Sequence, residues 1–179
     1  MKREYYNIII RYLILILIAL PNLYLFYLIF TPLTVYPVYF LLNLFWEVSL
    51  QSNILFISDF SIEIIGACIA GSAYYLLLIL NLSIPKIDIK KRLRMIFFAF
   101  SSLLVLNILR IFLLVSLLLI NPHLFDITHK LFWYFISIIF VIGIWFAEVG
   151  IFKLKQIPIY SDIKFLMKQI NKSKSSKKY

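Results

Sequence analysis

The stretch that decides the fold runs from Phe97 to Ile120 and reads FFAFSSLLVLNILRIFLLVSLLLI. Its single charged residue is Arg110. About 20 predominantly apolar residues suffice for a helix to cross the hydrocarbon core of a bilayer, so this stretch predicts a transmembrane helix. An ionised guanidinium inside that core is costly, and a charged residue there is by default a candidate functional residue. Arg110 therefore directs attention to its possible partners elsewhere in the chain.

The composition of the whole chain agrees with a membrane protein. Of its 179 residues, 63% are hydrophobic and 15% are charged. This leaves too little polar surface to cover a soluble globule, and several apolar stretches approach the length of a membrane span. We therefore predict an all-α, polytopic membrane protein built as a bundle of about four transmembrane helices.

The basic residues predict the orientation of the chain and argue against a nucleic-acid partner. Thirteen of the 18 lie in two segments, Lys86–Arg94 and Lys153–Lys178, and both segments flank apolar spans. Cytoplasmic segments of membrane proteins carry such an excess of Lys and Arg. Lys2 and Arg3 place the N-terminus on the same side. The single cysteine cannot form an internal disulfide, and the sequence contains no metal-ligand cluster and no cofactor motif.

The topology follows from these spans and charges. The N-terminal apolar run shows no small-x-small cleavage site and is read as an uncleaved first span. Residues 1–152 are expected to form the membrane domain, and residues 153–179 a basic cytoplasmic tail with a weakly amphipathic stretch, Ser161–Ile170, before a disordered end. The predicted crossings are Asn7–Phe30 with a kink at Pro21, Ile64–Ile84, Arg94–Ile120 and His129–Phe152.

A short apolar segment, Val35–Val48, lies between the first two crossings. It spans about 14 residues, and helices of that length more often lie at a membrane interface than cross the membrane. Asn43 and Glu47 lie one turn apart on one face. We predict an interfacial helix on the outer face, because two cytoplasmic segments must be separated by an even number of crossings.

Two outer segments complete the expected fold. Ile54–Ile57 and Phe60–Ile64 are separated by Ser58-Asp59, which is typical of two short strands about a two-residue turn. A small hairpin is therefore predicted, with an extended loop as the alternative. After the third crossing, a short outer loop is expected to carry His123 and Asp126.

This topology brings three uncommon residues to a similar depth. Cys68 lies near the outer end of the second crossing, and His129 lies at the outer end of the fourth. Arg110 lies roughly 24 Å along a helix from Arg94 at 1.5 Å per residue, which is the outer third of a hydrocarbon core roughly 30 Å thick. All three are therefore expected near the extracytoplasmic interface.

The chemistry of such a group is that of acyl transfer. A thiolate is the reactive form of cysteine, and a nearby Arg or protonated His favours it. A His within reach can carry the proton to a leaving amine, and an Arg can stabilise an oxyanion where water is excluded. Asn107 lies three residues before Arg110 on the same helical face, so it could orient neighbouring groups or donate to the oxyanion.

Three runs carry a family resemblance: 67-ACIAGS-72, 107-NILRI-111 and 126-DITH-129. They resemble the three motifs of the exosortase/archaeosortase family of integral membrane cysteine transpeptidases, and the resemblance covers roughly residues 64 to 150. It implies that Cys68 is the nucleophile, Arg110 the electrostatic stabiliser and His129 the acid/base. Gly71 lies three residues after the cysteine, where the bacterial pattern more often has Gly two residues after it. This departure and the short chain favour a small archaeal-type member.

The resemblance also implies a substrate and a location. The expected partners are exported proteins with a C-terminal sorting signal, made of a short motif, a transmembrane segment and a basic end, together with membrane lipids. The enzyme would cut near the motif, through a cysteine acyl intermediate, and pass the protein to a membrane or surface acceptor. The active site would lie near the outer face of a multi-pass cell-membrane protein.

Each residue also has a simpler interpretation. Cys68 alone is typical of a small packing residue. Arg110 could form a structural ion pair with Glu148 or Glu63, and His129 could be an interface residue. The alternative function is therefore a non-enzymatic small membrane protein, such as a holin-like or transporter subunit, in which Arg110 is a structural or ligand-binding charge.

Overall fold

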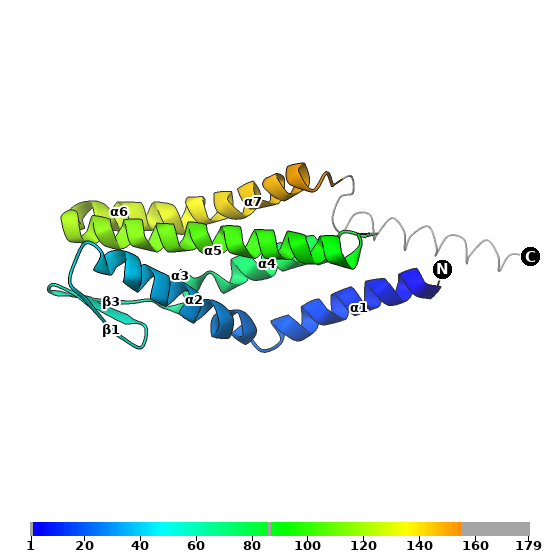
Figure 1. The fold of residues 1–179 in the computed structure, drawn as a ribbon, viewed down its shortest axis with the longest axis horizontal. Coiled ribbons are helices and arrows are strands. Elements are labelled where there is room, and N and C mark those ends of the chain that lie inside the picture. The colour runs from blue at the N-terminus through cyan, green and yellow to red at the C-terminus, as the bar shows by residue number, and fades with distance from the viewer. Residues whose placement is uncertain (1, 86, 155–179) are drawn as a thin grey trace, which may run out of the picture.

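The computed structural model describes residues 2–85 and 87–154 and consists mostly of helices, with one small sheet at one end (Figure 1). The predicted amphipathic stretch Ser161–Ile170, and the tail from residue 155 onward, lie outside the described residues. The elements in chain order are α1 (Lys2–Ala19), α2 (Tyr24–Asn43), β1 (Val48–Gln51), β2 (Ile54–Ile57), β3 (Phe60–Glu63), α3 (Gly66–Ile69), α4 (Gly71–Leu82), α5 (Ile89–Ile120), α6 (Pro122–Leu131), the π-helical turn η1 (Phe132–Ile136) and α7 (Ser137–Ile151).

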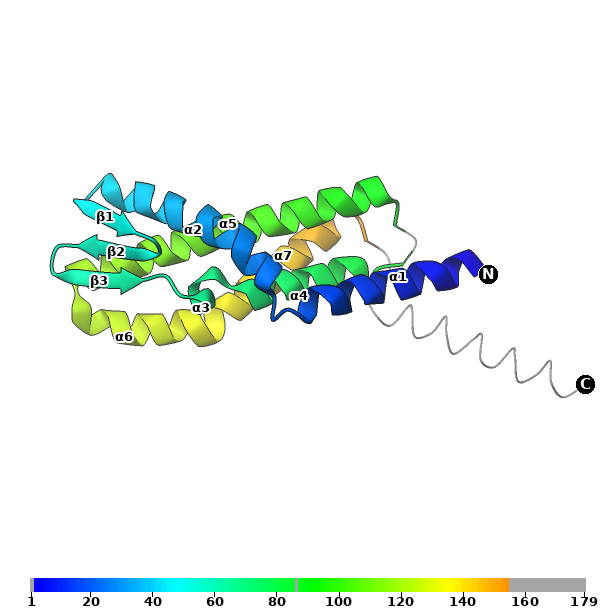
Figure 2. The same ribbon diagram turned by 90° about the horizontal axis from the view of Figure 1, so that it is seen from below.

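Helix α5 is the centre of the bundle. It packs against α2, α4, α6 and α7. The helix predicted over Arg94–Ile120 is found, and it begins earlier, at Ile89, because the Asp88 side chain caps it by accepting a hydrogen bond from the Lys90 backbone N–H at 3.1 Å. In two perpendicular views α1 and α2 lead from one end of the molecule to the other, α3 and α4 lead back, α5 returns, and α6 to α7 run back again (Figures 1 and 2).

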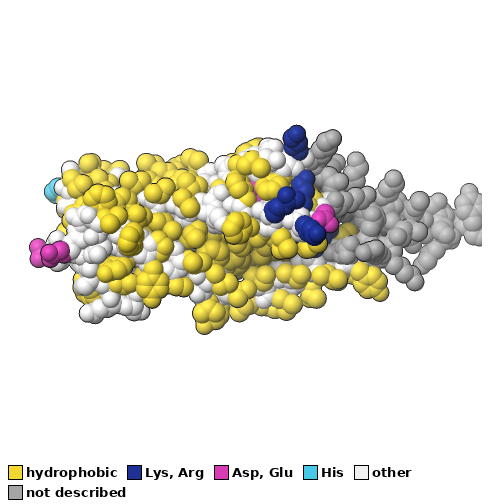
Figure 3. Space-filling model, viewed as in Figure 1, with side chains coloured by type: hydrophobic (Ala, Val, Ile, Leu, Met, Phe, Trp, Pro, Cys, Tyr) yellow, Lys and Arg dark blue, Asp and Glu magenta, His cyan; other side chains and the backbone are white. Residues whose placement is uncertain are grey.

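The surface of the bundle matches an apolar surrounding. In the described part of the chain, two helices are long and apolar enough to cross a membrane, α2 and α5, which indicates membrane association. Hydrophobic side chains cover most of the visible face, Lys and Arg gather near the start of α5 and the end of α7, acidic side chains lie at both ends, and a histidine lies at the end opposite the Lys and Arg (Figure 3).

The N-terminal region differs from the prediction at Pro21. The chain was expected to kink there within a single crossing, Asn7–Phe30. Instead, α1 ends at Ala19 and a short turn follows, in which Asn22 at φ 50° and Leu23 at φ 60° lie in the left-handed region. This turn ends α1 and allows α2 to start in a new direction at Tyr24. The boundary lies at the predicted residue, but its geometry is a turn between two helices.

The predicted interfacial helix over Val35–Val48 is wrong. Its first part belongs to α2, which continues through Pro32 and Pro37 to Asn43, and Val48 already begins β1. Proline removes a backbone hydrogen bond, but helices packed against neighbours tolerate it. The buried side chains that hold α2 in the bundle include Phe26, Phe30, Val35, Val38 and Leu42.

The predicted hairpin is confirmed, and a third strand extends it. Strands β2 and β3 are antiparallel, with Ile57 opposite Phe60 across the predicted Ser58-Asp59 turn. Strand β1 pairs antiparallel with β2 on its other side. Leu55 and Ile57 are fully buried, so one face of β2 packs into the protein. The sheet covers the end of the bundle where α2 ends and α6 begins (Figure 1).

The predicted outer loop carrying His123 and Asp126 is also wrong. Helix α6 starts at Pro122, directly after the Asn121 cap, and leads through η1 into α7. Proline has no N–H and a fixed φ, and both properties suit the first position of a helix. Pro122 therefore starts a helix here, whereas the sequence predicts that it ends the third crossing and begins a loop.

Two arginines bind the backbone carbonyls at the C-terminal end of α4. Arg92 is buried and donates from Nη1 to the Asn81 and Leu82 carbonyls, at 2.5 and 3.0 Å, and from Nη2 to the Ile84 carbonyl at 2.7 Å. Arg11 donates from Nη1 to the Leu82 and Ile84 carbonyls at 2.9 and 3.1 Å. The last carbonyls of a helix lack partners within it and carry the negative end of its dipole, so both cations are well placed.

Candidate active site

The crossing predicted over Ile64–Ile84 is broken beside Cys68. Helix α3 ends at Ile69, Ala70 adopts the left-handed conformation at φ 61° and ψ 39°, and α4 starts at Gly71. This conformation costs roughly 1–2 kcal/mol for a residue with a Cβ. Gly71 allows a close approach, since a Cβ there would lie 2.8 Å from the Tyr27 ring. Strained backbone of this kind clusters at functional sites.

Asn107 holds the broken end in place. Its Nδ2 donates to the Cys68 carbonyl at 2.7 Å, and the residue is only 2% exposed. In a continuous α-helix that carbonyl would accept from the backbone N–H four residues later, that of Ser72. The amide therefore replaces a hydrogen bond lost at the break. In this structure Asn107 is a positioning residue for the backbone of Cys68.

Arg110 lies within electrostatic range of the Cys68 thiol. Its guanidinium is close enough to the half-buried Cys68 side chain for the two groups to interact electrostatically, and it is 8% exposed. Nη1 donates to Ser137 Oγ at 2.8 Å, and that hydroxyl donates in turn to the Phe132 carbonyl at 2.8 Å. Arg110 Nε is buried without a hydrogen-bond partner among the described residues.

Sequence reasoning missed Ser137 and the turn that precedes it. Residues 132–136 form a π-helical turn, and Ser137 is the next residue. Such turns are frequent at functional sites because they redirect side chains out of the regular helical pattern. The sequence of η1, FWYFI, carries no signal for this turn. The presence of Arg110 signalled that some polar partner was required, but not which one.

His129 lies on α6, in surroundings of its own. It is half-buried on α6, and its ring stacks on Phe125 with centroids 5.2 Å apart. Ser137 follows it by eight residues in one helical run, so His129 lies roughly 12 Å along that run from the level of Ser137 at the rise of an α-helix. The structure joins Asn107 to Cys68 by a hydrogen bond and places Arg110 within electrostatic range of the thiol, while His129 lies roughly 10 Å along its helix from the start at Pro122.

Glu148 and Glu63, the two predicted ion-pair partners of Arg110, lie in other parts of the structure. Glu148 is fully buried near the end of α7, where its Oε2 accepts a hydrogen bond from Asn81 Nδ2 at 3.0 Å. Glu63 is exposed at the end of β3. Within residues 2–85 and 87–154, no three His, Cys, Asp or Glu side chains gather as metal ligands would. Arg110 instead donates a hydrogen bond to the hydroxyl of Ser137.

Comparisons of the chain with protein-family models, with curated proteins and with solved structures find no match.

The left-handed Ala70 gives a test of the break itself. Ala70→Gly is expected to raise the free energy of unfolding by about 0.5–1 kcal/mol, because glycine adopts this conformation without a steric cost, less the entropy it adds to the unfolded chain. The matched control is Ala73→Gly inside α4, which should lower it by about 1 kcal/mol. Reversible unfolding in mixed detergent micelles measures both. Equal destabilisation by the two substitutions would contradict the break.

Proposed function

We propose that this protein is a membrane-embedded cysteine transpeptidase or protease of the exosortase/archaeosortase kind. Its substrates would be exported proteins with a C-terminal sorting signal, cut near the outer face and passed to a membrane or surface acceptor. The observation that carries the proposal is the Cys68 thiol at a helix break, beside the buried Arg110 guanidinium. A packing cysteine needs neither a broken helix nor a cation beside it.

The proposed topology has four crossings, by α1–α2, α3–α4, α5 and α6–α7. The path of the chain between the two ends of the molecule supports it (Figures 1 and 2). The basic end, with Lys90, Lys91, Arg94 and Lys153, would face the cytoplasm according to the positive-inside rule. The sheet, with Asp59 and Glu63, would then lie outside. Broken helices within a membrane are tolerated where protein buries the freed backbone groups, as Asn107 does at Cys68.

The proposed reaction starts with attack of the Cys68 thiolate on the carbonyl carbon of the scissile peptide bond. The Arg110 guanidinium favours the thiolate and donates to the oxyanion. Collapse of the tetrahedral species forms a thioester on Sγ and breaks the C–N bond. The leaving amine takes up a proton and departs with the C-terminal fragment. An amine, a hydroxyl or water then attacks the thioester and restores the thiol.

His129 is proposed as the acid/base that protonates the leaving amine. The proton would pass from the His129 ring to the leaving amine through water or through groups of the bound substrate. Asn107 acts through the backbone of Cys68 and keeps the nucleophile in register with Arg110.

A second candidate function is favoured by the hydrogen bond from Arg110 to Ser137. This bond joins α5 to α7 inside the bundle, so Arg110 could serve assembly alone in a holin-like or transporter subunit. In that case the thiol would be dispensable, and loss of the Arg110 charge would impair folding or assembly.

A covalent trap tests the proposed enzyme directly. The protein would be incubated in membranes with a substrate protein that ends in a short motif, an apolar span and a basic cluster, and then quenched in acid. We expect a thioester between the substrate and Cys68, seen by mass spectrometry and released by hydroxylamine. Because Cys68 is the only cysteine in the chain, every thioester reports on one site. Turnover of this substrate without any adduct in rapid-quench samples would count against the mechanism.

A further inference from the structure

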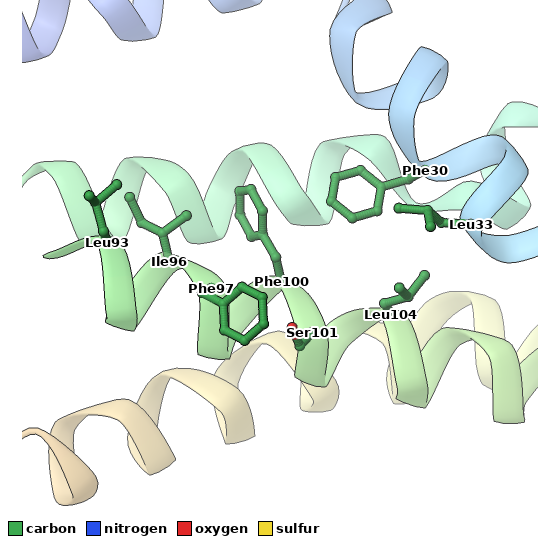
Figure 4. Close-up of a pocket in the computed structure, with 8 residues that line it drawn as sticks. All are labelled: Phe30, Leu33, Leu93, Ile96, Phe97, Phe100, Ser101 and Leu104. Carbon is green, nitrogen blue, oxygen red and sulfur yellow. The ribbon is translucent and has the colours of Figure 1, made fainter. Parts of the chain in front are cut away.

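An apolar groove lies between α2 and α5, away from Cys68. Its volume is about 610 Å³. Phe30 and Leu33 of α2 face the α5 side chains across it, and the α4 ribbon passes behind (Figure 4). The lining from α5 consists of Leu93, Ile96, Phe97, Phe100, Ser101 and Leu104.

The groove is long, its lining is almost entirely apolar, and it is open to the surroundings of the protein. From Leu93 to Leu104 it follows α5 for roughly 16 Å at 1.5 Å per residue. Leu33 is 45% exposed and Phe97 is 75% exposed. Ser101 is the one hydroxyl in an otherwise hydrocarbon lining. Such a groove matches a single extended acyl chain, which has no polar group along its length.

Two cations lie at the end of the groove where α5 begins. Lys90 and Arg94 are one turn apart on the helical face that also carries Leu93 and Phe97. Both are exposed, and helical side chains lean toward the N-terminus of their helix, which directs these two beyond the groove. Asp88 lies nearby as the α5 cap, where its carboxylate accepts from the Lys90 backbone N–H. The local side-chain charge is +1 when Asp88 is counted against the two cations.

We propose that this groove binds one anionic phospholipid. One acyl chain lies along α5 between Leu93 and Leu104, and the phosphate lies between Lys90 and Arg94. The charge complementarity at one end and the hydrocarbon lining along the rest select a ligand with an anionic head and an apolar chain. The site is separate from Cys68 and does not require the protein to be an enzyme.

Native mass spectrometry of the full-length protein, delipidated in detergent and titrated with lipid, tests this site. We expect dioleoyl phosphatidylglycerol to bind more tightly than dioleoyl phosphatidylcholine. Removing both charges, with Lys90→Gln and Arg94→Gln, should weaken phosphatidylglycerol binding about 25-fold, or about fivefold for each charge near the membrane surface. Ser101→Trp should fill the groove and weaken binding of both lipids.

Matched controls separate lipid binding at this site from nonspecific attraction of anionic lipid to the basic protein. Lys153→Gln removes a charge at the same basic end, just after α7, from a residue that does not line the groove, and Leu113→Trp adds an indole on the exposed part of α5 beyond the groove. Both should leave lipid binding unchanged. If Ser101→Trp fails to fold, Phe97→Ala removes a largely exposed wall of the groove and should weaken binding without loss of stability. Equal binding of the two lipids, equal weakening by Lys153→Gln, or unchanged binding in Ser101→Trp and Phe97→Ala would each overturn the proposal.

Discussion

Cys68→Ala is expected to abolish processing of a substrate with a C-terminal sorting signal, with a loss of at least about 10⁴-fold when a covalent nucleophile is removed. The side chain is small and half-buried, and its backbone carbonyl, which Asn107 holds, is unchanged by the substitution. The variant should therefore keep its fold and its abundance in the membrane. The measurement is the rate at which the substrate loses its C-terminal segment in cells or proteoliposomes, followed by gel shift.

The control for this prediction is Ser72→Ala, one turn further along the broken crossing. Ser72 is exposed near the start of α4, so its loss should leave processing unchanged. Processing by Cys68→Ala at the wild-type rate would show that the thiol is not the nucleophile, and would favour the non-enzymatic alternative.

Arg110→Gln is expected to lower the processing rate by about 10² to 10³-fold, the cost of removing one oxyanion donor. Arg110→Lys should also lose most of the activity, because an ammonium keeps the charge but lacks the planar set of N–H donors. In Arg110→Gln alkylation of Cys68 by iodoacetamide should slow, since the Arg110 cation favours the reactive thiolate, whereas Arg110→Lys keeps a cation and should slow alkylation less. As the chain has a single cysteine, the incorporated label measures that site alone.

The structural role of Arg110 is isolated by Ser137→Ala. This substitution removes the hydrogen bond from Arg110 Nη1 but keeps the guanidinium. It should reduce activity less than Arg110→Gln and leave the alkylation rate close to that of the wild type. If Ser137→Ala and Arg110→Gln instead lowered protein abundance equally, while Cys68 reacted at the wild-type rate in both, Arg110 would be a structural residue only.

The fold was predictable where one pattern acted alone. Strands β2 and β3 alternate about a two-residue turn, and α5 is a long apolar run with an acidic cap. Prediction failed at prolines, whose effect depends on their surroundings. Pro21 lies in the turn between α1 and α2, Pro122 starts a helix, and Pro32 and Pro37 lie inside α2. Packing against neighbouring helices decides between these outcomes, and the sequence does not show that packing.

The site was predictable in its residues but not in its geometry. The sequence predicts Arg110 and Cys68 at a similar depth, and in the structure the two groups lie within electrostatic range of each other. The break at Ala70 had no signal, because alanine seldom adopts the left-handed conformation. The last helical run starts at Pro122 and not at His129, so His129 lies roughly 10 Å inside that run and not at its outer end. Ser137 could not be identified because the π-helical turn before it shifts the register of the helix.

The contacts around the broken crossing also bear on the order in which the helices assemble in a bilayer. A solitary α5 in lipid would carry the Arg110 charge at a cost of roughly 2.5–3.5 kcal/mol on insertion scales. A solitary α3–α4 segment would expose the Cys68 carbonyl to hydrocarbon. Docking of the two segments, followed by α7, satisfies both groups through Asn107 and Ser137. Under the proposed function, helix association in the membrane and assembly of the Cys68 site are therefore one event, and we expect a chain with its helices inserted but not yet docked to carry an inert thiol.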